Sequence, residues 1–298
     1  MVASALSKLP PAIALMAALV LSSSAVQAQH EALTRTPTPA VKLPRVASIN
    51  LCTDQLLLLL AEPEQILALS TLSRDSNGSY FFEQAKQHPQ VNAVAEDLLL
   101  LKPDLVLAGE FASRYTMDLL EELDIRVETL PIANSIEDML SNVQAAGELL
   151  LQNDRAAEIT QQVEDKLAVI SRQVNTLDRH NWPTAAVYDT NGYTVGASTL
   201  RGQAMELAGW SNVATDKGID SYGVLGLEQL IELRPQALIE SPYAAEHYSR
   251  GQMLTKHPAI RAAGLDPVVI DIPSNTTICA GPWTVDVIQR LVDAKDAL

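Results

Sequence analysis

Two segments of this chain carry nearly the same pattern of residues at an offset of 132 positions: EDLLLLKPDLVL begins at Glu96 and EQLIELRPQALI begins at Glu228. In each copy an apolar turn is followed by a basic residue, then by Pro103 or Pro235, and then by a short aliphatic run. Proline cannot continue a helix, so each copy predicts a helix, a tight turn and a buried strand. The chain is therefore expected to contain two similar α/β lobes.

Helix and strand patterns extend these lobes over residues 45–151 and 181–298. Between them, residues 152–180 carry apolar side chains at spacings of three and four, which predicts one long amphipathic helix. Coiled-coil dimerisation is the alternative for this helix, but the apolar pattern is short for a coiled coil. The predicted fold is α/β, with two Rossmann-like lobes joined by a single long rigid helix and a ligand cleft between the lobes.

The first 28 residues have the pattern of a secretory signal peptide. A basic region ends at Lys8, an apolar run covers residues 12–21, and the small residues before Gln29 fit a cleavage site. A membrane anchor is the alternative, but the apolar run is short for a bilayer. No cysteine follows the cleavage site, so a lipoprotein is not indicated. We expect an exported, soluble product with a flexible leader over residues 29–44.

The net charge of the chain argues against several classes of partner. The chain has 36 acidic and 21 basic residues, for a net charge of −15. This excess disfavours nucleic acid and anionic membranes as partners, and it disfavours a highly anionic small molecule unless arginines gather at the site. About 270 residues remain after the signal, enough for two lobes that each have a core.

The two cysteines, Cys52 and Cys279, lie near opposite ends of the mature chain. An oxidising compartment favours a disulfide between them. The alternatives are two unpaired buried thiols, or a thiolate site for a metal or cofactor. No CxxC motif or Cys/His cluster supports the thiolate site.

The order of elements, the long interlobe helix and the paired LKPDLVL and LRPQALI segments resemble the class III periplasmic substrate-binding proteins of ABC importers. That family carries ferric siderophores, haem and cobalamin, and the resemblance covers about residues 45–298. It implies a monomeric periplasmic receptor that captures a bulky metal chelate in the cleft and delivers it to an inner-membrane permease.

In that family an acidic residue on each lobe docks onto arginines of the permease. Glu96 and Glu228, which open the two repeated helices, are similar in position. Two carboxylates related by the lobe symmetry would suit a two-fold symmetric partner, and arginine binds carboxylates bidentately. The alternative is that each glutamate is there only because the helix macrodipole favours it.

The loops at the carboxyl ends of the strands are expected to line the cleft. Aromatic rings in these loops suit a bulky, partly apolar ligand, and ordinary core packing is the alternative for any one ring. The expected ligand-binding residues are Asp54, Arg74, Tyr80, Phe111, Arg114, Tyr115, Tyr193, Tyr222, Tyr243 and Trp283.

Basic residues are scarce in these loops. Arg74 and Arg114 fall in the first lobe and Arg250 is peripheral in the second, which is few for a carboxylate-rich siderophore. Cobalamin therefore fits better, and a ferric siderophore of low charge is the next choice. Haem requires an axial ligand, for which the tyrosines and His247 are placed. The histidines are scattered, so neither a bare metal site nor a resident cofactor is expected.

Catalysis is the hypothesis from a different class. The chain has no GxSxG, P-loop or GxGxxG motif. Cys52, followed by Asp54, is the alternative nucleophile at a helix start, but a disulfide to Cys279 would remove it. A structural or adhesive role is the third class, and the cleft aromatics count against it. The expectation is a binding protein and not an enzyme.

Overall fold

The structure is a computed structural model that describes residues 42–176, 178–243 and 251–298. The predicted signal peptide and most of the predicted leader lie outside the described residues. Within the described ranges no helix is long and apolar enough to cross a membrane. The prediction of an α/β fold with two lobes is confirmed.

The N-terminal lobe is built on a parallel sheet in the order β3-β2-β1-β4-β5. Strands β1 and β4 are buried along their whole length, so their sequences are continuously small or apolar apart from Ser48 and show no alternation. The strands are β1 (Val46–Ser48), β2 (Ile66–Ser70), β3 (Gln90–Val91), β4 (Leu105–Gly109) and β5 (Val127–Leu130).

Helices cover both faces of this sheet. Leu57 and Leu60 of α2 pack on one face with Leu105 and Leu107, whereas Leu98 of α4 packs on the other with Val106 and Ala108. The helices of this lobe are α2 (Leu51–Leu60), α3 (Phe82–Ala85), α4 (Ala95–Leu101) and α5 (Arg114–Glu122).

The C-terminal lobe has a parallel sheet in the order β11-β10-β6-β8 and a separate antiparallel pair, β7 and β9. Its strands are β6 (Thr184–Val187), β7 (Tyr193–Val195), β8 (Ser211–Asn212), β9 (Tyr222–Val224), β10 (Ala237–Glu240) and β11 (Val268–Asp271). Its helices are α8 (Leu200–Leu207), α9 (Leu227–Leu233), α10 (Pro258–Ala262) and α11 (Thr284–Asp293). The β7/β9 pair is an element that the sequence analysis did not predict.

The predicted repeat is confirmed element by element. Helix α9 begins and ends 132 residues after α4, and β10 begins 132 residues after β4. Each helix ends at a basic residue in the left-handed backbone region, Lys102 with φ 47° and Arg234 with φ 49°. The proline that follows each of them prevents the helix from continuing, so the chain turns directly into the strand.

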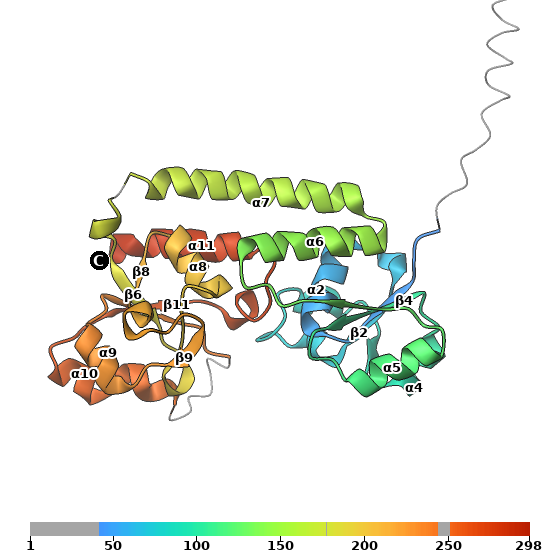
Figure 1. Cartoon of the computed structure of the whole chain (residues 1–298), viewed down its shortest axis with the longest axis horizontal. Helices are drawn as coiled ribbons and strands as arrows, with labels where there is room; N and C mark the ends of the chain where they lie inside the picture. The colour runs from blue at the N-terminus through green and yellow to red at the C-terminus, as the bar shows by residue number, and fades with distance from the viewer. Residues whose placement is uncertain (1–41, 177, 244–250) are drawn as a thin grey trace, which may run out of the picture. The chain divides into compact units, whose positions relative to one another are not determined.

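Two antiparallel helices, α6 (Ile136–Leu150) and α7 (Asn153–Val174), lie side by side along both lobes (Figure 1). Helix α6 begins in the C-terminal core at Ile136 and Met139, and ends in the N-terminal core at Leu150. Helix α7 runs back, from Ala156 in the N-terminal core to Val174 in the C-terminal core. The helix predicted over residues 152–180 is therefore α7, and α6 is a second element that spans both lobes.

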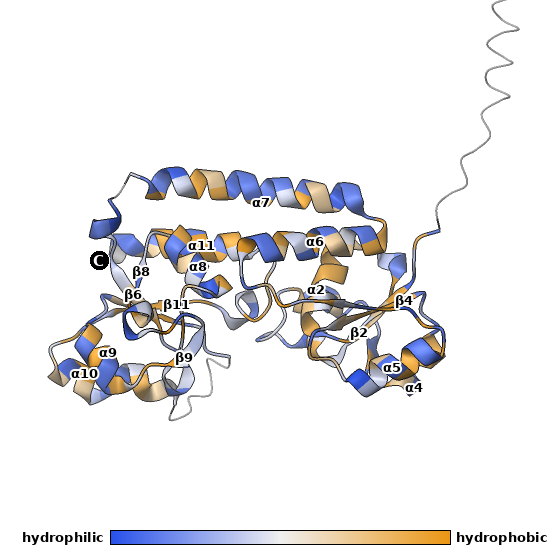
Figure 2. Cartoon of the chain, viewed as in Figure 1, coloured by the Kyte–Doolittle hydropathy of each residue, from blue (hydrophilic) through white to orange (hydrophobic). Residues whose placement is uncertain are grey.

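Close packing holds this helix pair together. A Cβ atom at Gly147 of α6 would lie 2.5 Å from the Cβ of Ala156 in α7, so only glycine allows the two helices to approach this closely. Figure 2 shows that α7 is mostly hydrophilic with scattered apolar residues, whereas α2 is mostly hydrophobic. This difference follows from burial, because α2 lies between the sheet and α6.

Candidate functional site: the interlobe cavity

A cavity of about 540 Å³ lies between the lobes, within the range of small-molecule sites. The N-terminal lobe contributes residues that follow β1, β4 and β5, and the C-terminal lobe contributes β7, β9, the start of α8 and the segment before α11. The cavity thus lies at the carboxyl ends of the strands in the N-terminal lobe, as expected for open α/β sheets.

The start of α2 forms part of the cavity wall that the N-terminal lobe contributes. The Asn50 side chain caps the helix, and its Oδ1 accepts hydrogen bonds from the backbone amides of Cys52 at 2.9 Å and Thr53 at 3.4 Å. Gly109, at the end of β4, lies against this cap, and a Cβ there would come within 2.5 Å of Asn50 Nδ2.

The rest of the N-terminal wall is largely apolar. Leu56, Leu130, Pro131 and Ile132 line it, and the ring of Phe111 is 84% exposed beside the cavity. The one charged side chain on this wall among the described residues is Glu110, whose carboxylate accepts a hydrogen bond from the Ile132 amide at 3.3 Å. This wall therefore offers mainly apolar contact to a ligand.

Two tyrosines dominate the C-terminal wall. Tyr193 of β7 and Tyr222 of β9 are stacked, with ring centroids 6.2 Å apart and planes 21° apart. The Tyr222 hydroxyl lies 3.5 Å from Oδ1 of Asn134, at the start of α6. Burial, and then the neighbouring Tyr222, raise the pKa of Tyr193 above its usual value. Its hydroxyl therefore stays protonated at neutral pH and is available as a hydrogen-bond donor.

Arg201 supplies the one cation that lines the cavity in the described part of the chain. Thr199 caps α8 and so places Arg201 in the first turn of the helix. The Arg201 Nη1 binds Oδ2 of Asp189 at 2.5 Å, and the other oxygen of Asp189 accepts the Ser241 amide at 2.7 Å. Nη2 of Arg201 is buried and has no hydrogen-bond partner. Arg201 was not among the predicted site residues, because only the tertiary placement of α8 brings it to the cavity.

The structure brings only part of the predicted ligand-binding set to the cavity. Phe111, Tyr193 and Tyr222 line it. Arg74, Arg114 and Tyr115 are exposed but do not line it, and the Arg74 guanidinium donates instead to the His88 carbonyl at 2.6 Å. Tyr80, Tyr243 and Trp283 lie in contacts between the lobes. His247 and Arg250 lie outside the described residues.

Asp54 was expected at the ligand, but the structure places it in the interior. Its carboxylate is fully buried and accepts hydrogen bonds from the backbone amide of Ser70 at 3.0 Å and the hydroxyl of Ser70 at 2.5 Å. Burial raises the pKa of Asp54 to about 6, against the opposing effect of hydrogen bonds from Ser70 and Ser48. Asp54 thus joins α2 to the end of β2.

Trp283 is likewise a buried packing residue and is only 3% exposed. Its ring stacks on Tyr80 at 4.7 Å and meets Phe81 edge-on at 5.5 Å, and its Nε1 donates to the Cys279 carbonyl at 3.1 Å. The Tyr243 hydroxyl donates to the carboxylate of Asp75. Tyr80, Tyr243 and Trp283 were predicted to contact the ligand, but each of them contacts a residue of the opposite lobe instead.

The structure contains the predicted disulfide between Cys52 and Cys279, which are 227 residues apart. Both cysteines line the cavity, one from each lobe. Their pairing leaves neither a free thiol nucleophile nor a thiolate ligand in this structure. In the described ranges no group of three or more His, Cys, Asp or Glu residues is placed to hold a metal ion.

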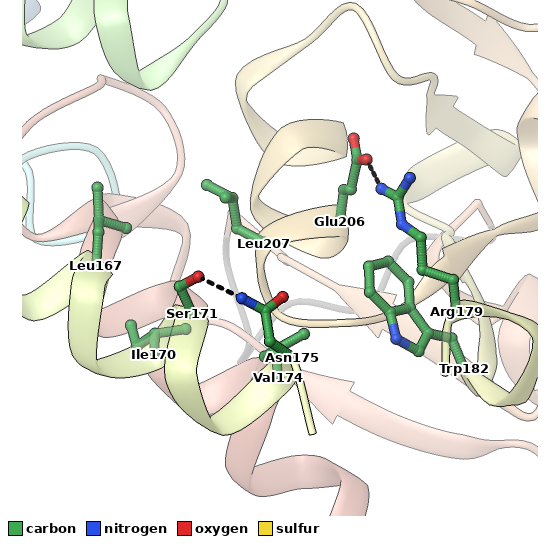
Figure 3. A pocket seen from close by; sticks show the side chains of 9 residues that line it. All are labelled: Leu167, Ile170, Ser171, Val174, Asn175, Arg179, Trp182, Glu206 and Leu207. Carbon is green, nitrogen blue, oxygen red and sulfur yellow. Dashed lines mark hydrogen bonds and ion pairs between the residues drawn. The ribbon is translucent and has the colours of Figure 1, made fainter. Parts of the chain in front are cut away.

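A second cavity, of about 290 Å³, lies between the end of α7 and α8 (Figure 3). Its apolar floor includes Ile170, Val174 and Leu207, and Arg179 at its rim pairs with Glu206 and lies over the ring of Trp182 at 4.9 Å. This cavity does not touch the N-terminal lobe, so the interlobe cavity is the better candidate for ligand binding.

Two α/β lobes, a spanning helix pair and a cavity at the lobe junction define a two-lobed ligand-binding protein. A family model described as "Periplasmic binding protein" matches residues 46–262. The chain belongs to this family, whose members are substrate-binding proteins.

Two curated relatives match part of the chain. A cobalamin-binding protein of Halobacterium salinarum is 30% identical over 145 residues, which are 48% of this chain and 39% of the relative. An uncharacterised ABC transporter substrate-binding lipoprotein of Bacillus subtilis, YvrC, is 23% identical over 155 residues, 50% of this chain and 49% of the relative. The matches thus span less than half the length of these relatives.

Solved structures show the same fold over most of the chain. A periplasmic heme binding protein from Pseudomonas aeruginosa has a TM-score of 0.68 at 21% identity, covering 85% of this chain and 92% of that one. The periplasmic vitamin B12 binding protein BtuF of Vibrio cholerae has a TM-score of 0.63 at 16% identity, covering 86% and 98%. At these identities the likeness is one of fold.

Proposed function

We propose that this protein is the periplasmic solute-binding component of an ABC importer. It captures a bulky metal chelate of low charge, cobalamin before a ferric siderophore, and as a monomer delivers it to an inner-membrane permease. The observation that carries the proposal is the interlobe cavity, which combines an apolar wall, two stacked tyrosines and a partly neutralised cation. Sites of this kind suit large, partly apolar ligands.

The charges of the lining favour a ligand that is close to neutral. Glu110 and Arg201 are the charged lining residues in the described part of the chain, and Asp189 already shares the charge of Arg201. A siderophore with several carboxylates would need several arginines for its recognition. Cobalamin carries neutral amide arms and one phosphodiester anion, which matches a lining whose described residues include one arginine. A relative named as a cobalamin-binding protein supports this choice.

Each wall has a separate role in this proposal. The apolar residues of the N-terminal wall and the ring of Phe111 cover the hydrophobic surface of the chelate. The hydroxyls of Tyr193 and Tyr222 donate to its polar arms, and the guanidinium charge of Arg201 attracts the anion.

A haem-binding receptor is the second candidate, favoured by the fold neighbours named as heme binding proteins. Tyr193 is the lining tyrosine with a raised pKa, which disfavours the phenolate that an axial ligand to ferric iron needs. An exported cysteine-dependent enzyme is the least favoured alternative, because Cys52 is bonded to Cys279.

The docking role belongs to the proposal as well. Glu96 and Glu228 are exposed in the first turns of α4 and α9, the two helices of the repeat. Equivalent positions on two similar lobes would present two carboxylates to a two-fold symmetric permease. Arginines of the permease would bind them bidentately.

Calorimetric titration of the purified mature protein with cyanocobalamin, haemin and a ferric hydroxamate siderophore tests this function. We expect saturable binding of cyanocobalamin with one site per chain and no change in the ligand after release. Binding of haemin alone would establish the second candidate. Absence of binding to all three ligands would overturn the proposal.

A further inference from the structure

One segment of the N-terminal lobe, Asp75–Phe81, is held by the C-terminal lobe along its length. The Ser274 hydroxyl donates to the Asn77 carbonyl at 2.7 Å, and the side-chain Nδ2 of Asn275 donates to the Ser76 carbonyl at 3.1 Å. At the start of the segment Asp75 accepts the hydroxyl of Tyr243. At its end Tyr80 and Phe81 pack on Trp283. All of these partners lie on the opposite lobe.

The same segment is tied to the helix that carries Cys52. Oε1 of Gln55, which is fully buried in α2, accepts the backbone amide of Tyr80 at 2.8 Å. Cys52 lies one turn earlier in that helix and is bonded to Cys279. On the C-terminal side, Trp283 donates from its Nε1 to the carbonyl of Cys279. The disulfide and the segment therefore join the same two local structures.

We propose that the Cys52–Cys279 disulfide and the Asp75–Phe81 segment form a redox-sensitive latch that fixes the separation of the two lobes and keeps the interlobe cavity preformed. The disulfide is the covalent member of this latch, and it also forms part of the cavity wall. A change in the position of either cysteine therefore changes the shape of the cavity directly. The hydrogen bonds and ring contacts of the Asp75–Phe81 segment are the noncovalent members of the latch, and they join the same two lobes as the disulfide.

The latch controls ligand affinity because it sets the fraction of protein molecules whose cavity walls are already placed for binding. While the bridge is intact, a ligand meets a cavity whose walls are already placed, and no ordering cost is subtracted from binding. If only a fraction of the molecules keeps this arrangement after the bridge is cleaved, the apparent dissociation constant rises by the inverse of that fraction. The latch thus makes ligand capture depend on an oxidising compartment.

The cleavage step is thiol–disulfide exchange with a dithiol. The disulfide takes up two electrons and two protons to give the thiols of Cys52 and Cys279, and the dithiol becomes a disulfide. Cys279 is 2% exposed and Cys52 is half-buried, so attack on the bridge is expected first at the sulfur of Cys52.

Hydrogen exchange measured on the full mature chain without ligand tests the latch directly. The informative amides are those of Gly78 and Ser79, which bond the Asp75 carbonyl, and that of Tyr80, which bonds Gln55. We compare the oxidised protein, the same protein reduced with dithiothreitol, and the variant C52S/C279S. Exchange at these amides is expected to rise about tenfold or more in both bridge-free forms. Unchanged exchange would overturn the latch.

A binding measurement with cyanocobalamin extends the test and rests on the proposed function. We expect the dissociation constant to rise about tenfold when the bridge is removed. If the oxidised protein fails to bind cyanocobalamin, the proposed function fails, while the exchange data still decide the latch. The matched control is Lys166→Ala, which removes the ion pair between α7 and Asp286 of α11 and should leave both measurements unchanged.

A further variant guards against a loss of folding. If circular dichroism shows that C52S/C279S is unfolded, Tyr80→Ala with the bridge intact removes the ring contact to Trp283 across the lobes, together with the edge-on contact to Phe81 within the segment. This variant is expected to raise exchange at Gly78 and Ser79 with an unchanged helix signal. Protection equal to that of the wild type in Tyr80→Ala and in the reduced protein would reject the latch.

Discussion

Tyr193 and Tyr222 come from two antiparallel strands and present stacked rings to the interlobe cavity, with centroids 6.2 Å apart. The Tyr222 hydroxyl reaches toward Asn134, which belongs to the loop that leads into α6. Tyr222 thus connects the C-terminal wall of the cavity to the start of α6, one of the two helices that span both lobes. A ligand that fills the cavity contacts both rings.

Replacing Tyr222 with alanine is expected to weaken cyanocobalamin binding about tenfold, or about 1.4 kcal/mol. The loss follows from the missing ring contact and hydroxyl donor. The matched control is Tyr115→Ala, because Tyr115 is 77% exposed and does not line the cavity. Calorimetric titration of both variants gives the comparison. Equal losses in the two variants would show that the cavity lining does not define the ligand site.

Arg201→Gln is expected to lower affinity for cyanocobalamin, and to remove the salt dependence of binding that a charge-assisted contact produces. It also leaves Asp189 without its cation, which is expected to lower stability. The double variant R201Q/D189N should recover stability but not affinity. Thermal denaturation and titration in low and high salt separate these effects. Full recovery of affinity in the double variant would exclude a direct contact between Arg201 and the ligand.

Asp54 is expected to make stability depend on pH. Its pKa is raised from 3.8 to about 6, so the folded protein binds this proton more tightly than the unfolded chain. The group therefore favours folding most at low pH, and this contribution is lost as the pH rises from about 4 through about 6. The difference corresponds to a free energy on the order of 3 kcal/mol.

Urea unfolding of the wild type and Asp54→Asn at pH 4 and pH 7 measures this contribution. When the pH is raised from 4 to 7, the free energy of unfolding of the wild type should fall relative to that of the variant. The half-buried Glu240 also has a raised pKa, but it is present in both proteins and cancels in the comparison. Parallel pH profiles would show that Asp54 titrates normally in the folded protein.

The double variant E96K/E228K is expected to bind cyanocobalamin normally and to abolish uptake in cells that carry the matching permease. Both glutamates are exposed and neither lines the cavity, so a loss of ligand binding would contradict the docking role. Glu164→Lys is the control because Glu164 is exposed on α7, away from the two repeated helices. Uptake should be retained in this control.

The sequence predicted the repeated unit well because the signals that form it are local. Pro103 and Pro235 end their helices wherever the rest of the chain lies, and the aliphatic runs that follow can only be buried. The β7/β9 pair was not predicted because it depends on a contact between distant residues. Gly192 turns the chain with φ 75° directly against the Leu225 carbonyl, and that partner is not visible in the sequence next to Gly192.

The candidate site was predicted less completely, for the same physical reason. Phe111, Tyr193 and Tyr222 were identified from loop position, and all three line the cavity. Trp283 was assigned to the ligand because its loop follows a strand, but its stacking partner Tyr80 comes from the opposite lobe. Arg201 lies in a helix, and only the tertiary placement of α8 brings that helix to the cavity.

The spanning of both cores by α6 and α7 has a consequence for unfolding. Leu150 and Ala156 belong to the N-terminal core, while Ile136 and Val174 of the same two helices belong to the C-terminal core. Neither lobe can melt without removing apolar partners from the other. Heating should therefore give one cooperative transition with matching calorimetric and van't Hoff enthalpies, although two lobes joined by a simple linker would melt separately. The molecule is in this sense one folding unit with two sheets.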